Sequence, residues 1–309
     1  MNAKDYWADR AIQSRKIVDK TEASSFYRMN KILSLNLKSV EKQIKAFDVE
    51  SINENLTAKQ TKDIKDLLRS TSEKAKKDKY LAELYTSDAK LYRINRLEGL
   101  RASIQAEMSE MVLKNESDVL NTVLQVGYGT NKFNLATFKN SFGLELNGIS
   151  PKQIEVIANS SWVGSKNYSQ RIWADRYAVG KKMDSLFVKE FVQGKSLPTI
   201  AKAVKDKFQT STYNAMRLVR TEATHMHSQA DLLYYEEVGS DKYEYQAYLD
   251  SRTSDICKGL DNEIFYTKDA QTGVNFPPMH PNCRSTTLPL PDYKKLKDKY
   301  GLTEQDFLL

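Results

Sequence analysis

Glycine and proline are missing from a large part of this sequence. The first 98 of its 309 residues contain neither, because the first glycine is Gly99 and the first proline is Pro151. These two residues end helices most effectively, so their absence argues against a turn-rich N-terminal region. Apolar residues recur there at helical spacing, as at Ile32, Leu35, Val40 and Ile44. The spacing predicts long packed helices without the sustained heptads of a coiled coil.

Cysteine and long apolar runs are also scarce. Two cysteines in 309 residues exclude a disulfide framework and fit a reducing cytoplasm. No window approaches eighteen consecutive apolar residues, and the polar start Met1–Trp7 does not resemble a signal peptide. We therefore expect a soluble intracellular protein with no membrane partner. Its net charge of +7, from 47 Lys and Arg against 40 Asp and Glu, is a mild basic bias.

The sequence also lacks recognisable catalytic motifs. The sequence has no phosphate-binding loop of the Walker type, no dinucleotide glycine fingerprint and no catalytic triad order. A chain with many helices and no such motif is more typical of an assembly component than of an enzyme. We therefore predict a protein without catalytic activity and without catalytic residues.

Turn signals divide the chain into three predicted regions. Residues 1–150 form a long-helix region, residues 151–211 a helical connecting region, and residues 212–309 a small α+β domain. Within these regions we expect breaks at 51–55, 70–72 and 127–130. Helices are expected over 151–158, 169–193 and 212–238, with a short one that Ser196 can cap. Short strands are expected at 243–249, 263–266 and 285–288.

The α+β domain contains both cysteines. Cys257 precedes the segment His280-Pro281-Asn282-Cys283, and a His-x-x-Cys spacing allows one turn to present both side chains to one metal ion. Cys257, His280 and Cys283 are therefore candidate zinc ligands, which Asp250, Asp255 or a preceding histidine would complete. The alternative is that hydrogen bonding and packing hold this domain, with the three residues buried and no cofactor bound.

Other polar residues of this region have structural interpretations. Arg220 and Glu222 are predicted to form charge-assisted hydrogen bonds within the protein, with Asp250 and Arg252 as partners. His225 and His227, two residues apart on a predicted helix, point about 200° apart and cannot share one ion. Both are expected to pack or to lie on the helix surface.

Several sequence blocks appear in order along the second half of the chain: Trp162–Trp173, Arg220–Ala223, Leu249–Thr253, Cys257 and His280–Arg284, with Arg284 closing the last motif. These blocks resemble the phage Mu protein F-like family of phage head morphogenesis or minor capsid proteins, in versions from phages of Gram-positive bacteria. This chain departs from the family in having Ser254 and Ser285 where many members carry cysteines. The absence of these two cysteine thiols favours the alternative in which the domain binds no metal.

The resemblance implies a minor capsid protein of the virion interior, made in the host cytoplasm. It would associate with the portal protein and other capsid or scaffold proteins, assist procapsid assembly, and contact double-stranded DNA non-specifically. The basic stretch Lys59–Lys79 offers weak phosphate binding, with eight Lys and Arg against four Asp and Glu. The alternatives are a zinc-supported nuclease or toxin-like effector and a non-specific DNA-binding protein. A DNA-binding regulator would use the stretch Gly194–Val204, which superficially resembles the first helix of a helix-turn-helix, but we expect a helical hairpin packed on its neighbours there.

Overall fold

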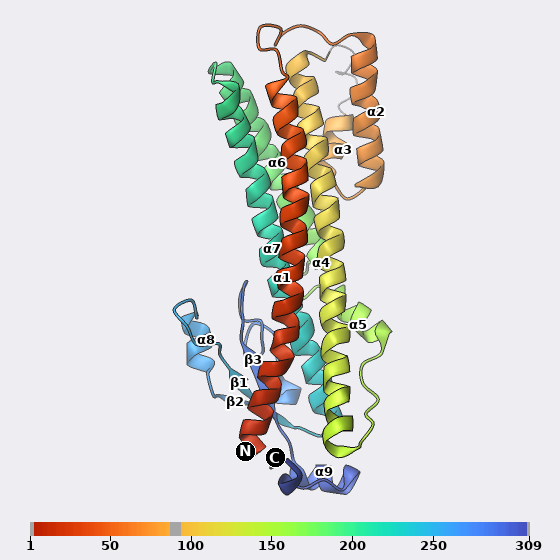
Figure 1. Ribbon diagram of the computed structural model, residues 1–309, viewed down its shortest axis with the longest axis vertical. Helices are drawn as coiled ribbons and strands as arrows, with labels where there is room; N and C mark the ends of the chain where they lie inside the picture. The colour runs from red at the N-terminus through yellow and green to blue at the C-terminus, as the bar shows by residue number, and fades with distance from the viewer. Residues whose placement is uncertain (1–2, 87–93, 308–309) are drawn as a thin grey trace. The chain divides into compact units, whose positions relative to one another are not determined.

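The computed structural model describes residues 3–86 and 94–307 and is mainly helical (Figure 1). Long helices dominate, and one small three-stranded sheet lies toward the C-terminal end of the sequence, so the predicted fold class is confirmed. The helices are α1 Ala3–Lys45, α2 Ala58–Lys74, α3 Lys79–Thr86, α4 Arg96–Phe142, α5 Pro151–Ala158, α6 Tyr168–Val192, α7 Leu197–Glu237, α8 Asp255–Leu260 and α9 Tyr293–Tyr300.

The described chain forms two compact units, each assembled from separated segments. Unit 1 comprises residues 1–25, 119–167 and 217–309, and unit 2 comprises residues 26–118 and 168–216. Helices α1, α4 and α7 contribute residues to both units. This division follows packing, whereas the predicted regions 1–150, 151–211 and 212–309 follow chain order, and those boundaries stay a prediction.

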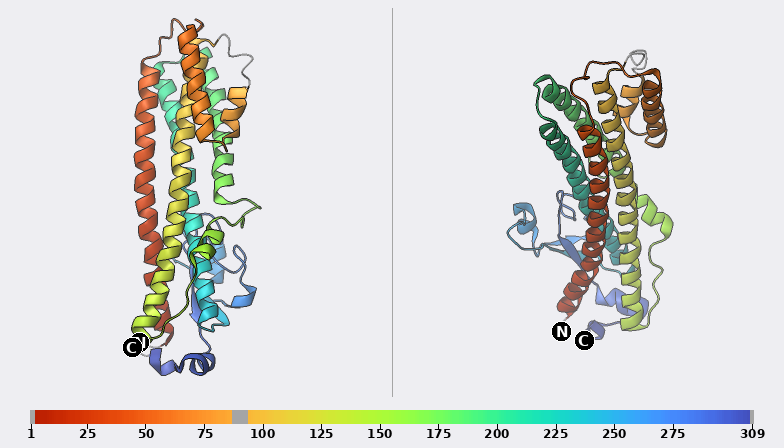
Figure 2. Two further views of the ribbon diagram at one scale, coloured as in Figure 1. Left: turned by 90° about the vertical axis from the view of Figure 1, so that its right-hand side faces the viewer. Right: turned by 45° about the horizontal axis from the view of Figure 1, so that its top comes forward.

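The predicted turn at residues 127–130 is wrong, because α4 passes through it as one helix in both views of Figure 2. Its two glycines serve helix packing instead. A Cβ on Gly127 would lie 2.8 Å from side-chain atoms of Ile154 and Met226, and a Cβ on Gly129 would lie 2.8 Å from Ile17. The missing side chains therefore let α4 approach α5 and α7 at one position and α1 at the other.

Two other predicted breaks also differ from the structure. Residues 70–72 lie inside α2, which ends at Lys74, and Thr71 is buried there. The break before residue 212 is absent, because α7 is a single helix that already begins at Leu197. The helix-turn-helix alternative therefore lacks its turn after Val204, whereas α6 and α7, joined by a short connection at 193–196, agree with the helical hairpin that we expected. The predicted helices at 151–158 and 169–193 are confirmed as α5 and α6 to within one residue at each end.

The sheet of unit 1 has the strand order β2-β1-β3 and is antiparallel throughout (Figure 1). Its strands are β1 Lys242–Gln246, β2 Ile264–Tyr266 and β3 Thr286–Leu290. All three predicted strands are present, although β1 stops three residues short of the predicted end. The central strand is covered on both faces, since the consecutive residues Tyr243, Glu244 and Tyr245 are all buried.

Each unit has its own core. In unit 1, apolar and aromatic residues from α1, α4, α7, the sheet and α9 form one cluster that includes Trp7, Phe138, Tyr235, Tyr243 and Leu288. In unit 2, Leu68, Leu81 and Ala102 pack together from α2, α3 and α4. Within residues 3–86 and 94–307, no helix combines the length and the apolarity needed to cross a membrane.

Candidate functional site

Cys257, His280 and Cys283 meet in unit 1, as their spacing predicted. The Cys257 Sγ atom lies 3.8 Å from Cys283 Sγ and 3.3 Å from His280 Nε2. All three donor atoms lie within 4.8 Å of one another. Both cysteines are free thiols and are buried, whereas His280 is half-buried. We name Cys257, His280 and Cys283 together the thiol–imidazole cluster.

The N-terminus of α8 positions the first thiol. Ser254 is the N-cap residue of this helix, and its Oγ accepts a hydrogen bond from the Cys257 backbone N–H at 3.2 Å. The same Oγ lies 2.9 Å from His280 Nε2. The cap therefore fixes the helix start and also places a hydroxyl beside the imidazole.

A tight loop positions the other two members. The Cys283 backbone N–H donates to the His280 carbonyl at 3.1 Å, and Asn282 has the left-handed φ of 65° that this turn requires. Helix α7 anchors the loop, because Thr224 Oγ1 donates to the Cys283 carbonyl at 3.1 Å and the Asn282 N–H donates to Thr221 Oγ1 at 3.3 Å.

The contact between the two thiols shifts their pKa values in opposite directions. A hydrogen bond from Cys283, aided by hydrogen bonds from Ser254, Ser285 and Tyr245, lowers the pKa of Cys257 against the effect of burial. The same bond to Cys257, together with burial, raises the pKa of Cys283. Cys257 is thus the member that becomes a thiolate first, with the Tyr245 hydroxyl donating to its Sγ at 3.3 Å.

The residues predicted to complete a metal site lie elsewhere. Among the described residues, no fourth His, Cys, Asp or Glu joins the cluster. Asp250 is held by Arg284, and Asp255 is exposed beside Lys258. His225 stacks on Trp162 with ring centroids 4.3 Å apart, and His227 contacts Thr130. Both histidines therefore pack within unit 1, and their contacts lie in different directions from α7.

A charged pair flanks the cluster. Arg284 Nη1 and Nη2 donate to the two oxygens of Asp250 at 2.7 and 2.6 Å, and its guanidinium lies 4.6 Å from the centroid of the Tyr248 ring. Hydrogen bonds from Arg284 hold the pKa of Asp250 well below its usual range. Arg252 adds a contact to the same carboxylate at 3.3 Å. A small pocket beside Cys257 and His280 is lined by Tyr248, Arg252, Asn282, Arg284 and Ser285.

Arg220 and Glu222 have partners that the sequence did not suggest. Arg220 Nε donates to Glu22 of α1 at 2.9 Å, and Glu222 accepts a hydrogen bond from Trp162 Nε1 at 3.0 Å. The predicted pairing of Arg220 and Glu222 with Asp250 and Arg252 differs from this arrangement, because Asp250 takes Arg284 as its bidentate partner.

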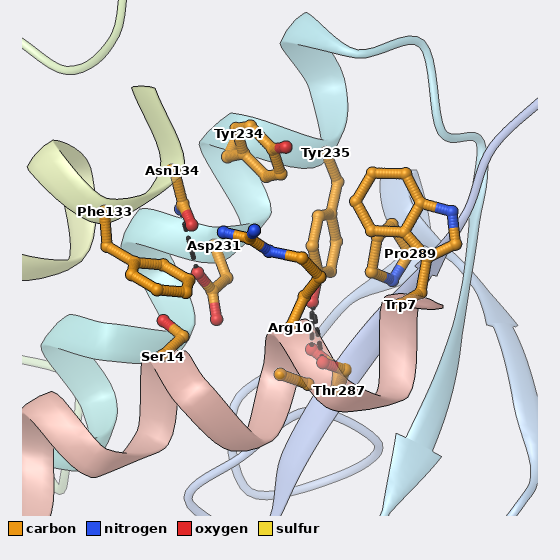
Figure 3. Close-up of a pocket in the computed structure, with 11 residues that line it drawn as sticks. Trp7, Arg10, Ser14, Phe133, Asn134, Asp231, Tyr234, Tyr235, Thr287 and Pro289 are labelled. Atoms are coloured by element: carbon orange, nitrogen blue, oxygen red, sulfur yellow. Dashed lines mark hydrogen bonds between the residues drawn. The ribbon is translucent and has the colours of Figure 1, made fainter. Parts of the chain in front are cut away.

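The structure contains a second polar site that the sequence did not predict. This site lies beside a pocket between α1, α4, α7 and β3 (Figure 3). Asp231 accepts a hydrogen bond from Asn134 Nδ2 at 3.1 Å, and its Oδ2 lies 3.3 Å from His227 Nε2. The Arg10 guanidinium lies 4.5 Å from the centroid of Phe133 in the same pocket. Burial raises the pKa of Asp231 to about 7, whereas burial and the Arg15 charge lower the pKa of His227 to about 3. The four-residue spacing of His227 and Asp231 on a helix was the available signal.

The fold and this geometry define a class of protein: mainly helical, with long helices and a small, loop-rich sheet region that contains two thiols and an imidazole in contact. Residues 181–288 match the family described as Phage Mu protein F like protein, so this part of the chain is similar to a domain of that family. The matched span contains the thiol–imidazole cluster, Arg220 and Arg284.

The chain is also similar to an "Uncharacterized protein" of Haemophilus influenzae (strain ATCC 51907 / DSM 11121 / KW20 / Rd), with 23% identity over 176 residues. That alignment covers 57% of this chain and 39% of the relative, so the chain spans about two fifths of the length of the curated relative it matches. No solved structure matches the chain.

Proposed function

We propose that this protein is a minor capsid protein that acts in phage head morphogenesis. The observation that carries the proposal is the match of residues 181–288 to the Phage Mu protein F-like family. In this proposal the protein is made in the host cytoplasm and enters the virion interior, associates with the portal protein and helps the procapsid to assemble. The sequence blocks favour a phage of Gram-positive bacteria as its source.

The helices offer the surface that such a role needs. Helices α1, α4 and α7 are 43, 47 and 41 residues long, and α1 has exposed residues along its length. Exposed apolar side chains include Tyr27 and Leu35 on α1 and Tyr213 on α7. Aromatic and apolar residues on a regular helix surface suit contacts with portal, capsid or scaffold proteins.

Contact with DNA is the second part of the proposal. The basic stretch Lys59–Lys79 in unit 2 has more positive surface than its sequence indicates, because Asp78 is buried against Arg176. Lys59, Lys62 and Lys74 are exposed around α2. Phosphate contacts of this kind bind duplex DNA without reading its sequence.

The test is the location of the protein during infection. Quantitative mass spectrometry of purified procapsids and virions should find it in few copies per particle, and a tagged chain should co-purify with the portal protein. A non-structural phage enzyme expressed at a similar level serves as the control for contamination. Absence from both kinds of particle would refute the proposal.

The enzyme alternative rests on the pocket beside Cys257 and His280, where a bound metal ion would have access to solvent. Incubation of duplex DNA with the zinc-supplemented protein and with the Cys283→Ser variant tests it. We expect neither protein to cleave DNA. Cleavage by the first and not by the second would favour a nuclease.

A further inference from the structure

Two of the three donor-atom distances in the thiol–imidazole cluster match those of a tetrahedral metal site, and all three donor atoms lie within 4.8 Å of one another. Two sulfur atoms bound to zinc at about 2.3 Å lie roughly 3.8 Å apart, and a bound sulfur and nitrogen lie roughly 3.5 Å apart. The corresponding distances here are 3.8 Å between the two Sγ atoms and 3.3 Å between Cys257 Sγ and His280 Nε2. A disulfide would require the sulfurs to approach to about 2.05 Å.

The imidazole is oriented as a metal ligand. His280 Nδ1 lies 2.9 Å from the Pro281 carbonyl oxygen, which can only accept a hydrogen bond, so the proton resides on Nδ1. The lone pair of Nε2 then faces Ser254 and Cys257. A backbone acceptor on the far nitrogen is the arrangement that fixes the tautomer of metal-bound histidines.

The donor set selects the kind of ion. Two thiolates and one imidazole are soft or borderline ligands that suit zinc, whereas calcium and magnesium require oxygen ligands. The Tyr245 hydroxyl, which donates to Cys257 Sγ, would stabilise the thiolate that a metal needs. Burial of Cys257 and Cys283 keeps the sulfurs away from bulk solvent.

We propose that Cys257, His280 and Cys283 bind one zinc ion through Sγ, Nε2 and Sγ. A solvent molecule from the adjoining pocket takes the fourth position beside the Ser254 hydroxyl. The ion joins α8 to the loop 277–285, two segments that are otherwise linked near this point by hydrogen bonds of Ser254 and of the cluster itself. This proposal is independent of the proposed phage role.

Metal analysis of the full chain tests the proposal directly. The protein, purified under reducing conditions without chelator, should contain close to one equivalent of zinc by elemental analysis. After exchange with cobalt it should show the thiolate-to-cobalt charge-transfer absorption and the strong visible bands of a tetrahedral site. These spectra are read on the unaltered chain, so they do not depend on whether a variant folds.

Ligand variants locate the ion. Cys257→Ser, Cys283→Ser and His280→Gln should each lose the metal or its thiolate spectrum, whereas His225→Gln, which alters a histidine outside the cluster, should retain both. Ser254→Cys supplies a fourth thiolate at the open position and should tighten zinc binding by more than about tenfold. Ser251→Cys adds an exposed thiol three residues earlier and should leave the affinity unchanged.

Three results would overturn the proposal. The first is protein that contains no metal and gives no cobalt spectrum on reconstitution after full reduction. The second is a Cys257–Cys283 disulfide in metal-free protein taken directly from cells, found by mass spectrometry of peptides. The third is stoichiometric zinc that survives in all three ligand variants.

Discussion

Arg176 on α6 and Asp78 at the start of α3 form an ion pair that is closed to solvent. The distance between Arg176 Nε and Asp78 Oδ2 is 3.0 Å, and the two side chains are 0% and 1% exposed. Arg176 Nη2 also donates to the Gln105 carbonyl and to Ser109 Oγ, both at 3.1 Å. The charge is therefore both paired and hydrogen-bonded, which a buried guanidinium requires.

Removing one partner of this pair should cost more than removing both. Arg176→Met leaves the Asp78 carboxylate buried without its counter-ion and should lower the free energy of unfolding by about 3–5 kcal/mol. The double variant Arg176→Met, Asp78→Asn should lose less than Arg176→Met alone. Urea denaturation followed by circular dichroism measures both variants.

An exposed ion pair in the same unit provides the control. Arg69 and Glu73 on α2 lie 3.0 Å apart, with side chains 67% and 64% exposed. Arg69→Met should therefore cost less than about 1 kcal/mol. Equal losses for Arg69→Met and Arg176→Met would contradict the importance assigned to the buried pair.

The packing role of Gly127 leads to a second prediction. A methyl group at this position would lie 2.8 Å from Ile154 Cγ2 and Met226 Sδ, so Gly127→Ala should destabilise the protein by about 1–3 kcal/mol through overpacking. This loss has to exceed the gain of about 1 kcal/mol in helix propensity. Thermal melts compare the variant with Gly259→Ala, a helical glycine of α8 with open space around it. That control should be neutral or slightly stabilising, and the reverse ranking would disprove the packing argument.

These glycines show where sequence reasoning succeeded and where it could not. Local signals were sufficient for α5, since Ser150 and Gln153 form the capping box that starts it and Pro151 occupies its first turn. Gly127 and Gly129 gave the same local signal as a turn. Only the neighbours Ile17, Ile154 and Met226, distant in sequence, show that the absence of a side chain serves helix contact.

Some contacts of the candidate site could likewise be predicted from the sequence, and others could not. His280 and Cys283 are three residues apart, so their convergence was predictable from spacing, and Cys257 was close enough in the chain to join them. The partners of Arg220 and Asp250 depend on tertiary packing. Glu22 is 198 residues from Arg220, and no periodicity within either segment indicates that pairing.

His227 and Asp231 predict opposite pH responses in two variants. The pKa of Asp231 rises from 3.8 to about 7 in the folded protein, so this group favours folding at low pH and loses that contribution as pH rises through 7. The pKa of His227 falls from 6.5 to about 3, so this group disfavours folding as pH falls below 6.5. Between about pH 4 and 6.5 the two contributions nearly cancel in the unaltered protein.

Asp231→Asn leaves only the histidine contribution, so its stability relative to the unaltered protein should fall as pH is lowered from 6.5 to 4. His227→Gln leaves only the aspartate contribution, so its relative stability should rise over the same range. Each slope should reach at most about 1.4 kcal/mol per pH unit. Urea denaturation at four pH values measures both, and parallel slopes would show that this pair does not titrate as described.

The proposed contact with DNA predicts an affinity for duplex DNA that falls as the salt concentration rises and that depends on the lysines of α2. Replacing Lys59, Lys62 and Lys74 with glutamine removes three exposed charges of the basic stretch. The apparent affinity for unrelated duplexes should fall, and the slope of log affinity against log salt should decrease by about 0.9 for each phosphate that these lysines no longer neutralise. Electrophoretic shifts at several salt concentrations measure both quantities.

The matched control replaces the exposed Lys152, Lys195 and Lys202, which gives the same change of net charge outside α2 and should have a smaller effect. Equal reductions in affinity for the two triple variants would assign the binding to net charge alone, and a thousandfold preference for one DNA sequence would contradict non-specific binding.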